Sequence, residues 1–216
     1  MLKHVVIAGV VAVALIVFNV VVGIENYKLH KSLQEEDTTP EEPKTYVNLI
    51  EEDHVVAVRT INGACTILRK IEQFRPNVHK PTVGSVNHIG YGFTAEEDIE
   101  LKYIDFNEAE RKLYDKVAVL YYKTIEENST LTVNQYAALI SFRYNIGETN
   151  WNKSDLRKYL IDGRIDRIAD EFPKFVYETV KVDNRVTKRK SRGLVRRRNV
   201  EQSIWNGTTT PDAFIW

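Results

Sequence analysis

The stretch at 72–94, EQFRPNVHKPTVGSVNHIGYGFT, decides the organisation of the chain, because it joins the end of a helical pattern to a glycine-punctuated hairpin. Upstream, apolar residues recur at helical spacing: Ile61, Ala64, Cys65, Leu68 and Ile71. Glu72 follows this stripe directly, so the helix is expected to deliver its carboxyl to a half-buried position. A half-buried carboxyl keeps its proton more readily than an exposed one, which suits a general acid. Pro76 then ends the helical pattern.

The end of this stretch, HIGYGFT at 88–94, alternates between two sets of residues. A strand here would place His88, Gly90 and Gly92 on one face, with bare backbone beside the histidine. Such a face suits the wall of a cleft that receives a polymer. Two glycines in a strand are otherwise typical of a bulge or a bend. The pattern therefore predicts either an active-site strip or an irregular hairpin.

Three motifs in a fixed order resemble the phage-type lysozymes, glycoside hydrolase family 24. They are a helix ending in Glu72 before a hairpin that closes on IGYG, the run LTVNQYAALISFRYNIGET at 131–149, and the run SRGLVRRRNVEQSIW at 191–205. The resemblance covers roughly residues 58–205. It implies an α+β, mostly α-helical fold, with a small β-hairpin lobe and a helical lobe around a central buried helix.

The resemblance also implies an activity. The expected reaction is cleavage of the β-1,4 bond between N-acetylmuramic acid and N-acetylglucosamine in peptidoglycan, during lysis of a bacterial host by a phage. No metal and no organic cofactor are expected. Glu72 takes the place of the catalytic acid, which protonates the leaving oxygen.

Two positions depart from the family pattern, which has an Asp nine residues after this Glu and a Thr immediately before IG. Pro81 stands at the first position and His88 at the second, and no Asp or Glu lies between Gln73 and Ala95. Three versions of the second role follow. His88 activates water, His88 attacks the anomeric carbon, or the 6-hydroxyl of the sugar attacks as in lytic transglycosylases. Alternatively, His88 only lines the cleft, and the chain is a wall-binding protein without turnover.

The resemblance assigns substrate-binding positions to Gly90, Tyr91, Asn145 and Arg192. Asn145 is expected either to hydrogen-bond a sugar or to make a local contact at the end of its helix. Arg192 is expected either to approach Glu72 and orient it or to be one arginine among many at a solvated helix start.

Residues 5–24 form an uncharged run of twenty residues, about 30 Å long as a helix, which is enough to span a bilayer. Lys3 precedes the run, so the positive-inside rule places the N-terminus in the cytoplasm and the rest of the chain in the periplasm. We expect residues 1–24 to be an uncleaved signal anchor in the host inner membrane, either permanent or of the signal-arrest-release kind, rather than a cleaved signal peptide.

The remaining chain divides by composition. Residues 25–57 are acidic and are expected to form a solvated tether. The catalytic domain is expected at 58–205 and a C-terminal tail at 206–216. Cys65 is the only cysteine, which rules out an intramolecular disulfide, and its place on the apolar stripe predicts a core residue rather than a catalytic thiol.

The net charge of zero hides a basic run, with nine basic residues and one Asp between Lys181 and Arg198. The run has no interleaved aromatic residues and no recognisable nucleic-acid module, so peptidoglycan and anionic lipid are the expected partners and nucleic acid is not. We expect a monomer.

Helical periodicity predicts further elements in the second half of the chain. A helix is expected over 107–126, and another begins after Thr132 as N-cap and stops at Gly147. This second helix is apolar nearly all round, which predicts the central core helix. Shorter helices are expected over 153–162 and 165–177.

Overall fold

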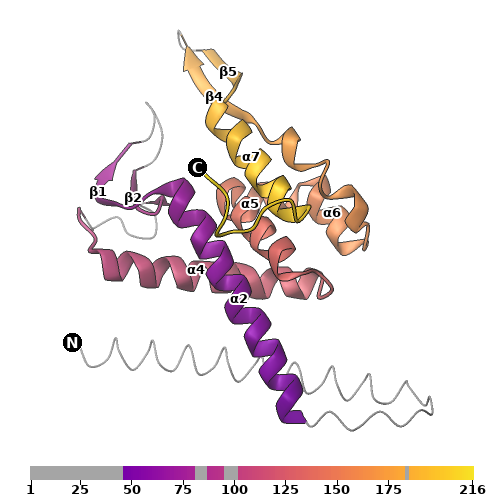
Figure 1. Cartoon of the computed structure of the whole chain (residues 1–216). Helices are drawn as coiled ribbons and strands as arrows, with labels where there is room; N and C mark the ends of the chain where they lie inside the picture. The colour runs from indigo at the N-terminus through magenta and orange to yellow at the C-terminus, as the bar shows by residue number, and fades with distance from the viewer. Residues whose placement is uncertain (1–45, 81–86, 95–101, 183–184) are drawn as a thin grey trace. The chain divides into compact units, whose positions relative to one another are not determined.

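The computed structural model describes residues 46–80, 87–94, 102–182 and 185–216, which belong to one compact unit from Tyr46 to Trp216 (Figure 1). The predicted signal anchor, the first part of the predicted tether and Pro81 lie outside these residues. Within them, no helix is both long and apolar enough to cross a membrane.

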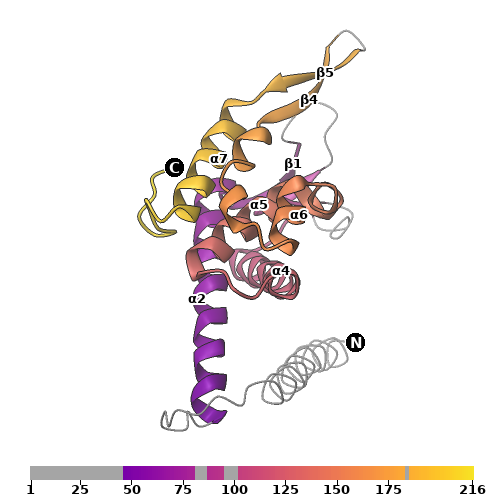
Figure 2. The same cartoon turned by 90° about the vertical axis from the view of Figure 1, so that its right-hand side faces the viewer.

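Helix α2, Tyr46–Glu72, ends at the predicted catalytic acid. It begins inside the segment expected to be tether, so the folded unit starts before residue 58. The first half of α2 runs beyond the other elements of the unit in both views (Figures 1 and 2). The helix ends where Gln73 takes a positive φ of 56° and donates its backbone N–H to the carbonyl of Arg69 at 3.3 Å. This stop leaves Glu72 in the last turn, next to the buried stripe.

A three-stranded antiparallel sheet follows, in the order β1-β2-β3. Its strands are β1 Arg75–His79, β2 His88–Gly90 and β3 Phe93–Thr94. The run HIGYGFT is therefore a tight hairpin rather than one strand, and the predicted alternation of its faces is wrong. Gly90 and Gly92 have φ values of 64° and 81°, and they fold the chain back so that Ile89 pairs with Phe93.

The central helix of the fold is α5, Val133–Asn152, and it packs against α2, α4 (Phe106–Glu127) and α7 (Arg192–Trp205). The predicted cap is confirmed, because Thr132 and Gln135 form a reciprocal capping box. Eight consecutive residues of α5, from Tyr136 to Arg143, are buried. The predicted stop at Gly147 appears as a kink with φ of 75° before a final turn.

The C-terminal lobe contains short elements between α5 and α7. They are α6 Asp155–Ile161, the 3₁₀ turns η1 Ile165–Arg167 and η2 Phe172–Lys174, and the strands β4 Tyr177–Val182 and β5 Arg185–Lys190. The helix predicted over 165–177 is wrong, since Pro173 lacks a backbone N–H and the segment forms two 3₁₀ turns instead. Strands β4 and β5 form an antiparallel hairpin that projects away from the helices in both views (Figures 1 and 2).

Residues 206–216, expected to be a tail, pack onto α2. Lys70 Nζ donates to the backbone carbonyls of Pro211, Asp212 and Phe214 at 3.3, 2.6 and 3.1 Å, and Phe214 is buried. Cys65 is buried on the same helix, and burial raises the pKa of its thiol to about 11. Cys65 is thus a core residue, as predicted, and its thiol stays protonated at neutral pH.

Candidate active site

The predicted acid, Glu72, is held by an arginine of α7. Arg197 Nη1 donates to Glu72 Oε1, and the two groups form an ion pair in which the Glu72 side chain is 22% exposed and the arginine is buried. The helix expected to supply this arginine is correct, but the residue is not. Arg192 lies five positions earlier, about 140° around the helix axis, and is exposed. The predicted approach of Arg192 to Glu72 is therefore wrong.

The predicted half-buried position of Glu72 is confirmed, and the ion pair adds a charged guanidinium in contact with its carboxyl. The residues that hold Arg197 therefore belong to the site.

Gly92 lies beside the side chains of both Glu72 and His88. A Cβ placed on Gly92 would lie 3.4 Å from Glu72 Oε2 and 3.8 Å from His88 Nδ1, so glycine leaves open the space beside both groups. Because the two distances of 3.4 and 3.8 Å are measured from the same point, Glu72 Oε2 and His88 Nδ1 are at most about 7 Å apart. This limit is compatible with the spacing of about 5 Å in retaining glycosidases and with the lower end, about 6.5 Å, of the inverting range.

Gly90, the other predicted glycine, does not face this space. A Cβ on Gly90 would meet the ring of Phe93 at 2.7 Å, so the residue is closed in by the core and not by a ligand site. Glycine is required at this position because φ is 64° and because the Phe93 ring leaves no room for a side chain. The predicted substrate-binding role of Gly90 stays a prediction, and Gly92 is the glycine that lies beside Glu72 and His88.

His88 is half-buried, and its surroundings favour the neutral imidazole. Burial lowers the pKa of His88, the neighbouring His79 lowers it further, and Glu72 acts in the opposite direction. His79 is the cross-strand partner of His88 between β1 and β2, with ring centroids 6.2 Å apart. A neutral imidazole can accept a proton near neutral pH, which is what a general base requires.

Tyr91 anchors the hairpin turn to the helices. Its side chain is 3% exposed, its hydroxyl donates to Glu110 Oε1 on α4, and Arg69 Nε on α2 donates to the same carboxylate at 2.8 Å. The carbonyl of Tyr91 accepts a hydrogen bond of 2.8 Å from the hydroxyl of Tyr144 on α5. The turn therefore directs the side chain of Tyr91 into the protein, and the predicted substrate contact of this residue stays a prediction. The residue fixes the position of Gly92.

Asn145 makes a contact that the sequence did not predict, because its partner lies on α7 and not at the end of its own helix. Arg198 Nη2 donates to Asn145 Oδ1, while Asn145 itself remains exposed near the end of the first part of α5. Arg198 is fully buried, and burial lowers its pKa to about 10, so it stays charged at neutral pH. The side-chain carbonyl of Asn145 accepts this hydrogen bond, and the Asn145 Nδ2 group takes no part in it. A hydrogen bond from Asn145 to a sugar remains a prediction.

Comparison with known proteins identifies the family. Residues 69–201 match the family described as phage lysozyme. The chain belongs to the phage lysozyme family. The matched range contains Glu72, His88 and Arg197, which the geometry brings to one site.

Individual relatives agree with this assignment. The chain is 34% identical over 122 residues to an endolysin of Bacillus phage PZA, covering 56% of this chain and 44% of that protein. It is 28% identical over 142 residues to an endolysin of Bacillus phage B103, covering 64% of this chain and 51% of that protein. The chain thus spans about half the length of the curated relatives it matches.

Among solved structures, the fold is similar to the muramidase domain of SpmX from Asticaccaulis excentricus, with a TM-score of 0.55 and 22% sequence identity. The match covers 66% of this chain and 93% of that one. The predicted α+β, mostly helical fold of the lysozyme type is confirmed.

Sequence reasoning missed three residues that surround Glu72 in this candidate site: Ser141, Arg197 and Glu201. Arg197 and Glu201 are spaced i, i+4 on α7, and Arg197 Nε donates to Glu201 Oε1 at 3.0 Å. An Arg–Glu pair at that spacing in a predicted helix was a readable signal. No group of three or more His, Cys, Asp or Glu in the described part of the chain could hold a metal ion.

Proposed function

We propose that this member of the phage lysozyme family is a muramidase of glycoside hydrolase family 24 that works as an endolysin. It cleaves the β-1,4 bond between N-acetylmuramic acid and N-acetylglucosamine in peptidoglycan and so lyses the bacterial host of a phage. The observation that carries the proposal is the juxtaposition of Glu72 and His88 beside Gly92. The endolysin relatives and the muramidase fold support the same substrate class.

In the proposed mechanism, Glu72 gives its proton to the glycosidic oxygen as the bond to the anomeric carbon breaks. The neutral imidazole of His88 takes a proton from water on the other face of the sugar, and that water attacks the anomeric carbon. The proton then passes from His88 to solvent, and Glu72 is reprotonated. Water attack on the face opposite the leaving group inverts the anomeric centre.

One sequence observation favours a second chemistry. No acidic residue lies between Gln73 and Ala95, so Glu72 is the only carboxyl in this strip. A lytic transglycosylase needs one acid only, because the 6-hydroxyl of the muramic acid attacks and leaves a 1,6-anhydro end. In that case His88 would be dispensable.

A zymogram on embedded cell wall tests the proposal. The wild-type chain should clear the wall, and Glu72→Gln should reduce clearing about 100-fold or more, because the transferable proton is lost while the shape is kept. Absence of clearing by a folded wild-type chain that still sediments with purified sacculi would identify a wall-binding protein instead.

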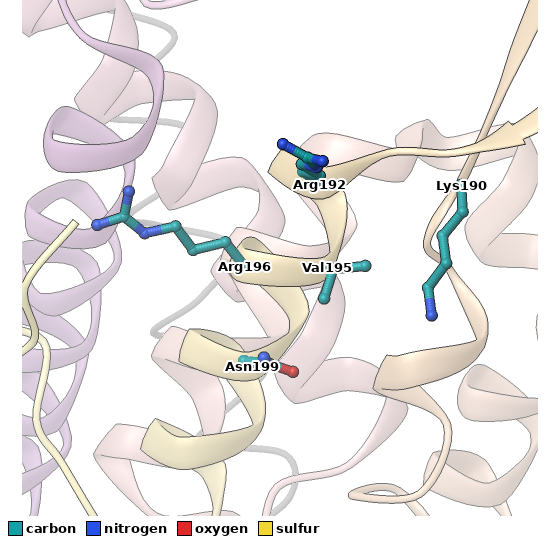
Figure 3. A pocket seen from close by; sticks show the side chains of 5 residues that line it. All are labelled: Lys190, Arg192, Val195, Arg196 and Asn199. Carbon is teal, nitrogen blue, oxygen red and sulfur yellow. The ribbon is translucent and has the colours of Figure 1, made fainter.

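We also propose that a cationic surface on α7 contacts the wall. Lys190, Arg192 and Arg196 surround a shallow hollow of about 460 Å³ together with Val195 and Asn199, and the long side chains spread over the helix and the end of β5 (Figure 3). Anionic groups of the peptidoglycan peptides complement these charges. The paired change Lys190→Glu and Arg192→Glu should weaken sedimentation with sacculi at low salt. Lys153→Glu with Lys158→Glu gives the same charge change away from this hollow, and equal weakening in both would refute the surface.

The location is a proposal drawn from the sequence. Residues 1–24 are proposed as a single-pass signal anchor in the host inner membrane, with the lysozyme domain in the periplasm and either retained or later released. Expressed in a Gram-negative host, the full-length chain should fractionate with the inner membrane, and its C-terminus should be open to protease in spheroplasts. A soluble, N-terminally processed chain as the main product would contradict the anchor.

A further inference from the structure

Arg197 uses all three sides of its guanidinium group. Nη1 donates to Glu72 Oε1, Nε donates to Glu201 Oε1 at 3.0 Å, and Nη2 donates to the carbonyl of Ser141 at 3.0 Å. The fork geometry of arginine fixes the group when several partners act at once. Arg197 is 3% exposed and Glu201 is fully buried. The position of the Arg197 guanidinium, which contacts Glu72, is therefore fixed by buried groups of α5 and α7.

Glu201 is the only other acidic group in the ion pairs of this cluster within the described chain. Its Oε1 also accepts from Ser141 Oγ at 2.7 Å, and its Oε2 lies 3.2 Å from Arg198 Nη1. The buried carboxylate of Glu201 thus faces two guanidinium groups. Burial would lower the pKa of Arg197, but Glu72 and Glu201 together raise it, so the arginine stays charged.

The charges facing Glu72 come from two elements besides α2. Arg197 of α7 is in contact, with Arg198 and Glu201 behind it, and His88 of β2 lies across Gly92. Two arginines against Glu201 leave one positive charge, which an ionised Glu72 balances. Without Glu201, two guanidinium groups would face Glu72 alone, and its ionised form would be favoured more strongly.

We infer that Glu201 is a positioning residue for the catalytic acid, acting through Arg197. It fixes the guanidinium that holds Glu72, and it offsets part of that positive charge so that Glu72 can carry and return a proton. The inference rests on the proposed role of Glu72 as the acid. Its physical content, electrostatic coupling between Glu201 and Glu72, can be measured without turnover.

Glu201→Gln separates charge from shape, because the side chain keeps its size and its acceptor oxygen. The pH at which Glu72 takes up its proton should fall by about one unit, the size expected for removing one charge a few ångströms away. The alkaline limb of wall cleavage reports loss of the acid's proton, so it should move to lower pH by the same amount. Near neutral pH, kcat should fall about tenfold with KM little changed.

The deciding experiment follows the carboxyl ¹³C resonance of Glu72 with pH, in the full-length chain in detergent micelles. Glu127→Gln is the matched control, because Glu127 belongs to a separate ion-pair cluster with Arg143 and Arg157. A midpoint lower in Glu201→Gln and unchanged in Glu127→Gln is the expected result. Equal midpoints in a folded Glu201→Gln and the wild type would overturn the inference.

The Arg197 Nε–H resonance and wall clearing give two further readouts, which distinguish failure of this inference from failure of the proposed function. In the wild-type chain, the Nε–H resonance of Arg197, which is bonded to Glu201, should shift with the same midpoint as Glu72. This coupling can be read even if Glu201→Gln does not fold, and a resonance that does not respond would also overturn the inference. A chain that shows the coupling but clears no wall would refute the proposed function and leave the electrostatic relationship standing.

Discussion

Arg197 on α7 forms an ion pair with Glu72 at the end of α2, across 125 residues of sequence. The acid is therefore positioned by tertiary structure, although its own helix delivers it. The hairpin turn completes the site from a third direction, since Gly92 stands beside Glu72 Oε2 and His88 Nδ1. A substitution in any of these three elements should reduce cleavage by more than its effect on folding stability explains.

Gly92→Ala tests the open space beside the catalytic groups. The new methyl group would stand 3.4 Å from Glu72 Oε2 and would fill the approach to His88, while the φ of 81° adds backbone strain of about 1–2 kcal/mol. Cleavage should fall at least about tenfold, beyond what the loss of stability explains. Gly163→Ala is the control, with φ of 69° and no atom within 4 Å of the new Cβ. Equal activity of the two variants would mean that substrate does not use this space.

Tyr91→Phe tests the assignment of Tyr91 to the hairpin anchor. Removing the hydroxyl leaves Glu110 with one donor fewer, so the free energy of unfolding should fall by about 1 kcal/mol, seen as a melting temperature lower by a few degrees. KM for soluble wall fragments should stay unchanged. Tyr177→Phe on the exposed hairpin should change neither quantity. A raised KM with an unchanged melting temperature would assign Tyr91 to substrate binding and not to the hairpin anchor.

The pH dependence of cleavage tests the electrostatics of His88. A base must be neutral to accept a proton, and burial together with His79 lowers the pKa of His88 below its ordinary value. Activity should therefore persist as the pH falls through about 6.5 and be lost only at lower pH. Substituting His79 by alanine removes a neighbour that lowers this pKa, so the acid limb should move to higher pH. If the acid limb lies at the same pH in His79→Ala as in the wild type, the result would argue against His88 as the base.

The sequence predicted those parts of the site that depend on local pattern. Glu72 follows an apolar stripe at helical spacing, and the N-cap residue Thr132 with the apolar run behind it located the central helix. Both signals lie within one element, where periodicity and caps act directly.

The parts that were missed depend on how elements pack. Which arginine of the run at 196–198 turns inward depends on the phase of α7 against α5, and one residue of rotation exchanges a buried group for an exposed one. Gly90 and Gly92 look equivalent in sequence, but only the turn geometry shows that Phe93 covers the first. The β4–β5 hairpin was missed because its basic residues were interpreted only as a charged surface for a partner, although Val180 and Val182 recur at strand spacing.

The most direct test of the Glu72–His88 pair is product analysis on purified peptidoglycan, with muropeptide masses and anomeric NMR at early times for the wild type, Glu72→Gln and His88→Ala. We predict a reducing end of inverted configuration from the wild type and a loss of about 100-fold or more in each variant. Retained configuration would change the role of His88 to that of a nucleophile. Full activity of His88→Ala with a 1,6-anhydro product would contradict the pair and leave Glu72 as a single acid.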